Sequence, residues 1–125
     1  MIKDVTDLNV YNEANRLLLK LYQLFKEVPK SELDLEWQIK RAAKSISANI
    51  AEGFGKRHFG KEFRRYLLNA LGSSDEVISH LRTLTLIKPN LSVKINSLLD
   101  EYKILSKRIN SLHKYWRFDT DPQTH

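Results

Sequence analysis

The 125-residue chain contains no cysteine. This absence excludes a disulfide framework, a thiolate metal site and a cysteine nucleophile. No apolar run approaches the roughly 18 residues that a membrane-spanning helix needs, so we expect no membrane segment. The first residues, MIKDVTDLNVYNEA, lack the basic and then apolar regions of a secretory signal peptide. We therefore expect a cytoplasmic protein.

Positive charge is concentrated in one segment. Eight basic and two acidic residues lie between Lys40 and Arg65, so this segment accounts for the whole formal charge of +6. A local excess of positive charge suggests an anionic partner such as RNA or DNA. The alternative is a solvated face that keeps the protein soluble. The candidate nucleic-acid-binding residues are Lys40, Arg41, Lys44, Lys56, Arg57, Lys61, Arg64 and Arg65.

Apolar residues recur every three or four positions along nearly the whole chain, which is the spacing of amphipathic helices. The pattern breaks at Pro29, at the glycines from Gly53 to Gly60, and at Pro89. It predicts four helices over about 7–28, 32–56, 60–87 and 91–115. Short links between them favour an all-α fold, an antiparallel up-down-up-down four-helix bundle. We expect this domain over 1–117 and a flexible polar C-terminal tail over 118–125.

The apolar content exceeds what one helix seam requires. In the first predicted helix, RLLLKLYQLF carries apolar residues nearly all round. Further apolar residues lie off the predicted seams: Leu68, Leu86, Ile87, Leu99 and Ile104. Exposed apolar surface usually marks an interface, so the pattern favours a homo-oligomer over a wide intramolecular core.

Motifs of enzymes and metal proteins are incomplete. The segment GKRHFGKE nearly matches a phosphate-binding loop, but Glu62 replaces the hydroxyl that binds Mg²⁺, and a helix precedes it. Glu76 and His80 could reach one ion, yet a di-metal bundle needs Glu-x-x-His pairs on two helices. Nothing places Ser45, Ser73 or another serine beside a histidine base. We expect no cofactor, no metal site and no enzyme.

Polar residues interrupt the apolar face of the second helix. We interpret Asn49 as fixing the helix register through a buried hydrogen bond. Glu52 would accept hydrogen bonds from Arg41, Arg65 or a hydroxyl of the third helix, and Gly53 would let the helix end or pack closely. The rival interpretation is a polar ligand pocket around Asn49 and Glu52.

Small residues interrupt the third helix in the same way. A mid-helix glycine costs about 1 kcal/mol relative to alanine. That cost is tolerable if Gly72 and Ser73 let a neighbouring backbone approach. Ser73 or Ser74 would then offer a hydroxyl to Asn49 or Glu52. The proposed structural motif is Asn49, Glu52, Gly53, Gly72, Ser73 and Glu76.

Two segments carry a family resemblance: QIKRAAKSISANIAEGFGKR, from Gln38 to Arg57, and EFRRYLLNALGSSDE, from Glu62 to Glu76. With them the chain resembles the four-helix-bundle proteins encoded in intervening sequences of bacterial 23S ribosomal RNA genes (S23-type proteins). It is similar to accessory proteins of diversity-generating retroelements. Ser47 departs from the proline that members often carry there. The resemblance implies a homopentamer with a basic surface, which in the retroelement relatives binds a reverse transcriptase and nucleic acid.

Two functions follow as hypotheses. The first is a non-catalytic oligomer that binds nucleic acid, RNA in particular, through the basic segment. Phe54, Phe59 and Tyr66 could stack on unpaired bases, although each could instead pack in the core or an interface. The alternative is an oligomeric scaffold that binds a partner enzyme and no nucleic acid of its own.

Overall fold

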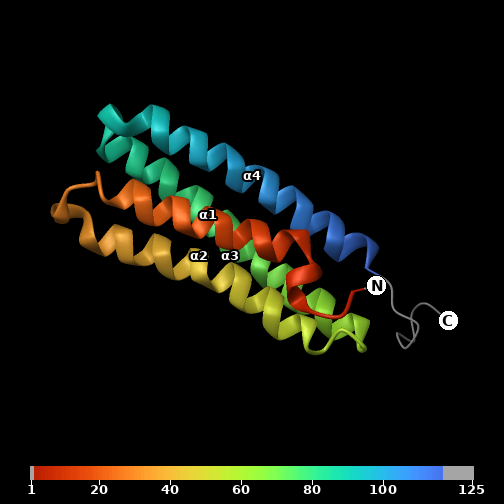
Figure 1. Ribbon diagram of the computed structural model, residues 1–125. Helices are drawn as coiled ribbons and strands as arrows, with labels where there is room; N and C mark the ends of the chain where they lie inside the picture. The colour runs from red at the N-terminus through yellow and green to blue at the C-terminus, as the bar shows by residue number, and fades with distance from the viewer. Residues whose placement is uncertain (1, 117–125) are drawn as a thin grey trace.

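The computed structural model describes residues 2–116, and it confirms the antiparallel up-down-up-down four-helix bundle (Figure 1). The helices are α1 (Asn9–Phe25), α2 (Leu33–Phe54), α3 (Gly60–Ile87) and α4 (Ser92–Tyr115). Three short 3₁₀ helices precede α1, α2 and α4: η1 (Val5–Asp7), η2 (Lys30–Glu32) and η3 (Pro89–Leu91). The predicted tail over 118–125 lies outside the described residues.

Helices α1, α2 and α4 are shorter than the periodicity predicts, because their ends wind into tighter turns. After Phe25, the backbone N–H groups of Lys26 and Glu27 donate to Gln23 and Leu24, three residues back. Such bonds satisfy the last carbonyl groups of a helix while ending its α-helical path. The apolar spacing continues through these turns, so periodicity alone extends the helix too far.

Each helix packs against two neighbours, in the cyclic order α1, α2, α3, α4. The α1–α2 and α3–α4 connections lie at one end of the bundle (Figure 1). The N-terminal segment, the α2–α3 connection and the end of α4 lie at the other. Within residues 2–116, no helix is both long enough and apolar enough to span a membrane.

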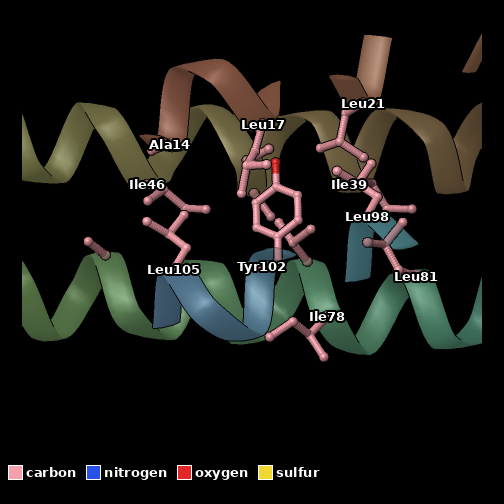
Figure 2. Close-up of a cluster of buried hydrophobic side chains, with 14 of the residues drawn as sticks. Ala14, Leu17, Leu21, Ile39, Ile46, Ile78, Leu81, Leu98, Tyr102 and Leu105 are labelled. Carbon is pink, nitrogen blue, oxygen red and sulfur yellow. The ribbon is translucent and has the colours of Figure 1, made fainter. Parts of the chain in front are cut away.

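All four helices supply side chains to one core, and Figure 2 shows part of it around Tyr102. Leu17 of α1, Ile46 of α2 and Leu105 of α4 are completely buried there. Burying one such side chain stabilises the fold by about 1.5–3 kcal/mol. The Tyr102 hydroxyl is also buried, and it has no hydrogen-bond partner among the described residues. Burial raises the pKa of this phenol above its ordinary value.

The apolar excess divides between core and surface. Leu17, Leu21 and Phe25 are buried, and so is Leu99, which the heptad spacing wrongly placed off the seam. The exposed members are Leu19, Tyr22, Leu68, Leu86, Ile87 and Ile104. A wide core therefore explains only part of the excess, and the remainder is available for contacts with other molecules.

Candidate nucleic-acid interface

The predicted basic residues form two groups rather than one. Lys40, Arg41 and Lys44 lie in the middle of α2, whereas the other five lie beyond its last residue, Phe54. At 1.5 Å per residue, about 15 Å of helix separates Lys44 from Phe54. We call the second group the basic end: Lys56, Arg57, Lys61, Arg64 and Arg65.

The group on α2 is engaged with neighbouring helices. Lys40 donates to the buried Glu36 carboxylate at 2.6 Å, and its ammonium lies 4.2 Å from the ring centre of Tyr22 on α1. Arg41 points to the other side and pairs with Glu76 of α3 at 3.2 Å. Carboxylates thus partly neutralise Lys40 and Arg41, which connect α2 to both neighbours. The Lys44 ammonium lies 5.7 Å from the Tyr22 ring centre.

The basic end is built around aromatic rings. The Lys56 ammonium donates to the Tyr66 hydroxyl at 2.9 Å, and this bond raises the pKa of Lys56. Arg65 lies 4.6 Å from the centre of the same ring and pairs with Glu62 at 3.0 Å. A guanidinium or ammonium over an aromatic face is attracted by the ring quadrupole. Tyr66 therefore holds two cations together at the surface.

Two further cations extend the basic end across the connection. The Arg57 guanidinium stacks 4.1 Å from the ring centre of Phe54 and donates to the Phe54 carbonyl oxygen at 3.1 Å. Arg64 donates to the carbonyl oxygen of Trp116, just after α4, at 3.3 Å. Burial, with the nearby charge of Arg64, lowers the pKa of His113. The end of α4 thus lies beside the basic end.

The three aromatic candidates differ sharply in exposure. Phe54 and Tyr66 are buried, with 5% and 9% of their surface accessible. Phe59, in the α2–α3 connection, is 69% exposed. Among these three, only Phe59 presents its ring to solvent for stacking on a base.

Helix α3 begins directly after Phe59, and no side chain caps its N-terminus. The first backbone N–H groups of a helix and its dipole favour a negative charge at this position. Lys61 lies in the same first turn and is exposed. The start of α3 therefore combines an aromatic ring, a cation and a helix N-terminus, with Glu62 of the same turn paired to Arg65.

Asn49 acts differently from its predicted role. Its amide donates to the backbone oxygen and hydroxyl of Ser45, at 2.8 and 3.0 Å, within α2. The Ser45 hydroxyl in turn lies 2.9 Å from that of Ser73 on α3. Asn49 is half-buried and reaches α3 only through Ser45, so the expected direct bond across the seam is wrong.

Glu52 is exposed, which corrects its predicted place in the core. Its expected partners are engaged elsewhere. Arg41 faces Glu76 across the α2–α3 contact, and Arg65 pairs with Glu62 one turn earlier in its own helix. These carboxylates are nearer in the fold than Glu52.

The two glycines have opposite surroundings. A Cβ atom on Gly53 would lie 2.5 Å from the Cβ atom of Tyr66, so α2 and α3 approach closely there. A Cβ atom on Gly72 would meet nothing within 4 Å. The predicted close approach at Gly72 is therefore wrong. Instead, the next residues bond in two directions, Ser73 to α2 and Ser74 to Ser106 of α4 at 2.7 Å.

A family model described as "23S rRNA-intervening sequence protein" matches residues 6–111. The chain belongs to this family. The match includes the basic end, most of α4 and the Asn49–Gly53 segment. No curated protein matches the chain.

In this intervening-sequence protein, the Glu76–His80 pair is part of an ion-pair cluster. One Glu76 oxygen accepts from Arg41 at 3.2 Å and lies 3.3 Å from the His80 ring nitrogen. Over the part of the chain that the structure describes, no three histidine or acidic side chains gather as metal ligands. The pair contributes to the α2–α3 contact.

Sequence reasoning missed a second source of positive charge. Between Tyr102 and Trp116 the chain has four basic and no acidic residues. They are Lys103, Lys107, Arg108 and Lys114. Outside Lys40–Arg65 the chain has as many acidic as basic residues, so this excess is seen only when charges are counted along α4 alone. Tyr115, which is 69% exposed, adds an aromatic ring at this end.

Proposed function

We propose that this intervening-sequence protein is a non-catalytic RNA-binding protein, and that it binds single-stranded RNA at the basic end. The observation that carries the proposal is Phe59, a 69% exposed ring between Arg57 and Lys61 at the uncapped start of α3. Exposed aromatic rings beside cations are typical of surfaces that bind single strands, because bases stack on the rings while cations neutralise phosphates.

The residues around the start of α3 suit different parts of an RNA strand. Lys61 and the helix N-terminus would hold phosphate oxygens, and Phe59 would stack on an unpaired base. Arg65 keeps 56% of its side chain exposed while it pairs with Glu62. Exposed pairs contribute little to stability, so Arg65 can exchange Glu62 for a phosphate at small cost. Such contacts recognise the backbone, and binding should be weakly sequence-specific and strongly salt-dependent.

We also propose that the protein assembles as a homo-oligomer, with a pentamer as the expected form. The exposed apolar side chains support this, because Leu19 and Leu86 are 67% and 83% exposed in the single chain. Contact between copies would remove such surface from water. An oligomer would present several basic ends and bind one RNA strand at several points.

The test is fluorescence anisotropy of a labelled single-stranded RNA, titrated with salt, on the full chain. The variants are Lys61→Ala, Phe59→Ala and, as a matched control, Lys30→Ala in η2 at the opposite end of the bundle. Lys61→Ala should reduce the slope of log K against log salt by about 1. Phe59→Ala should weaken binding by about 1–3 kcal/mol with little change of slope. Equal losses in Lys61→Ala and Lys30→Ala would contradict the proposal.

A protein-binding scaffold is the second candidate. Leu33 and Trp37 are 52% and 64% exposed near the start of α2, far along the bundle from the basic end. Trp is the side chain most enriched in binding hot spots. A partner contact that is insensitive to salt and lost in Trp37→Ala would favour this function over RNA binding.

A further inference from the structure

An apolar groove of about 600 Å³ lies between the N-terminal segment and α4. Its apolar lining comes from both sides: Ile2, Leu8, Val10, Ile104, Leu112 and Tyr115. Ile104 is 51% exposed, so the groove opens to solvent. The groove lies at the end of the bundle that also carries the α2–α3 connection, but neither Phe59 nor any residue of the basic end lines it.

Two cations line this groove, and neither Lys107 nor Arg108 forms a salt bridge with any described residue. The one acidic residue of the lining, Asp7, is turned to its own segment. Its carboxylate accepts from the backbone N–H groups of Lys3 and Asp4 at 2.9 and 3.0 Å, and these bonds lower its pKa. The groove thus offers an apolar surface on which two cations outnumber one carboxylate.

The groove continues along α4. Ile104 and Arg108 also line an adjoining hollow of about 230 Å³, which ends at Glu101. Two carboxylates, Glu13 and Glu101, line this hollow, and both are paired with cations. Arg16 bonds to both of them, and Lys20 bonds to Glu101 at 3.0 Å. From Glu101 to Tyr115 at 1.5 Å per residue, the two hollows follow about 21 Å of α4. That length matches a helix of about 14 residues.

We propose that this groove binds an acidic amphipathic helix of a partner protein. The apolar floor suits residues at i, i+3, i+4 and i+7 of such a helix, and Lys107 and Arg108 suit carboxylates beside them. Aliphatic side chains such as Ile104 and Leu112 give a nucleic-acid base nothing to stack on, and Tyr115 is the one aromatic ring of the lining. A second copy of this chain is the other candidate occupant, and the sedimentation measurement below distinguishes the two.

The test uses a fluorescein-labelled synthetic peptide of about 14 residues, with leucine at i, i+3, i+4 and i+7 and glutamate at most other positions. The control peptide has the same composition in a scrambled order. The full chain should bind the amphipathic peptide at least tenfold more tightly than the scrambled one. Lys107→Glu/Arg108→Glu and Ile104→Glu should each weaken binding about tenfold at near-physiological salt. The equally charged Lys103→Glu/Lys30→Glu variant should bind within about twofold of wild type.

Circular dichroism will show that each variant keeps its helices, and Ile104→Glu is safe in this respect because its side chain is half-exposed. Equal affinity for both peptides would overturn the proposal. So would an oligomer that Ile104→Glu dissociates in sedimentation equilibrium, since a second copy would then occupy the groove. A single-stranded RNA that loses more affinity than the peptide in Lys107→Glu/Arg108→Glu would assign the groove to nucleic acid instead.

Discussion

Alanine substitution of the two helical glycines should change stability in opposite directions. In Gly53→Ala the new methyl group would lie 2.5 Å from the Tyr66 Cβ atom and 3.0 Å from a ring carbon of Phe63. The Tyr66 Cβ atom moves only with its backbone, so α2 and α3 must separate. Overpacking of this kind costs about 1–3 kcal/mol. Alanine recovers at most about 1 kcal/mol of helix propensity, and less in the last turn of α2.

Gly72→Ala is the matched control, because the same atom is added in open space in the middle of α3. It should raise the free energy of unfolding by about 1 kcal/mol. Urea unfolding followed by far-UV circular dichroism measures both changes, and unchanged m-values would show that the unfolded states are comparable. If both substitutions stabilise the protein equally, α2 and α3 do not approach at Gly53 and this part of the fold is incorrect.

Three further predictions concern buried polar groups. Tyr102→Phe removes a hydroxyl that has no partner among the described residues, and should raise the free energy of unfolding by about 1 kcal/mol; a loss of similar size would reveal a partner. Because burial raises the Tyr102 pKa, the native protein keeps this proton when the unfolded chain loses it near pH 10. Wild-type stability should therefore fall above about pH 10, and the advantage of Tyr102→Phe should grow in urea titrations there; a constant difference would contradict this. Ser106→Ala breaks the bonds to Ser74 and Asp75 and should cost about 1 kcal/mol in thermal unfolding, whereas exposed Ser111→Ala should be neutral.

The helices and their order were predictable because each helix buries one stripe. Apolar residues at three- and four-residue spacing, such as Ile39, Ile46 and Ile50, report that stripe directly, and all three are completely buried. Helix ends were less predictable, since Lys26 and Glu27 continue a plausible helix while the backbone turns into 3₁₀ bonds. Whether the last backbone N–H groups of a helix bond three or four residues back depends on the direction in which the chain continues.

The candidate site was only partly predictable, because spacing along the chain does not say what faces a charge. Lys40 and Arg41 are adjacent in sequence, yet one lies over Tyr22 of α1 and the other pairs with Glu76 of α3. Glu36 pairs with Lys40, but the hydrophobic pattern cannot predict that it is buried, because that pattern assigns acidic residues to the surface. The burial of Glu36, with 8% of its surface accessible, becomes evident only in the folded bundle.

The distinction among the aromatic residues was present in the sequence. Phe54 continues the buried stripe of Ile46 and Ile50, whereas Phe59 follows Gly55 in the connection. A residue on the stripe is expected in the core, and a residue in a connection is expected at the surface. Tyr66 required the structure, because only the fold shows that it packs against Gly53 of α2.

The most direct test of RNA binding at the basic end is ultraviolet cross-linking of the full chain to a single-stranded oligouridine, followed by mass spectrometry of the linked peptides. Aromatic rings stacked on a base are placed to cross-link with it. The account predicts a linked peptide that contains Phe59, lost in Phe59→Ala and kept in Trp37→Ala, whose ring is 64% exposed elsewhere on the bundle. Cross-links centred on Trp37, with Phe59 unmodified, would contradict it.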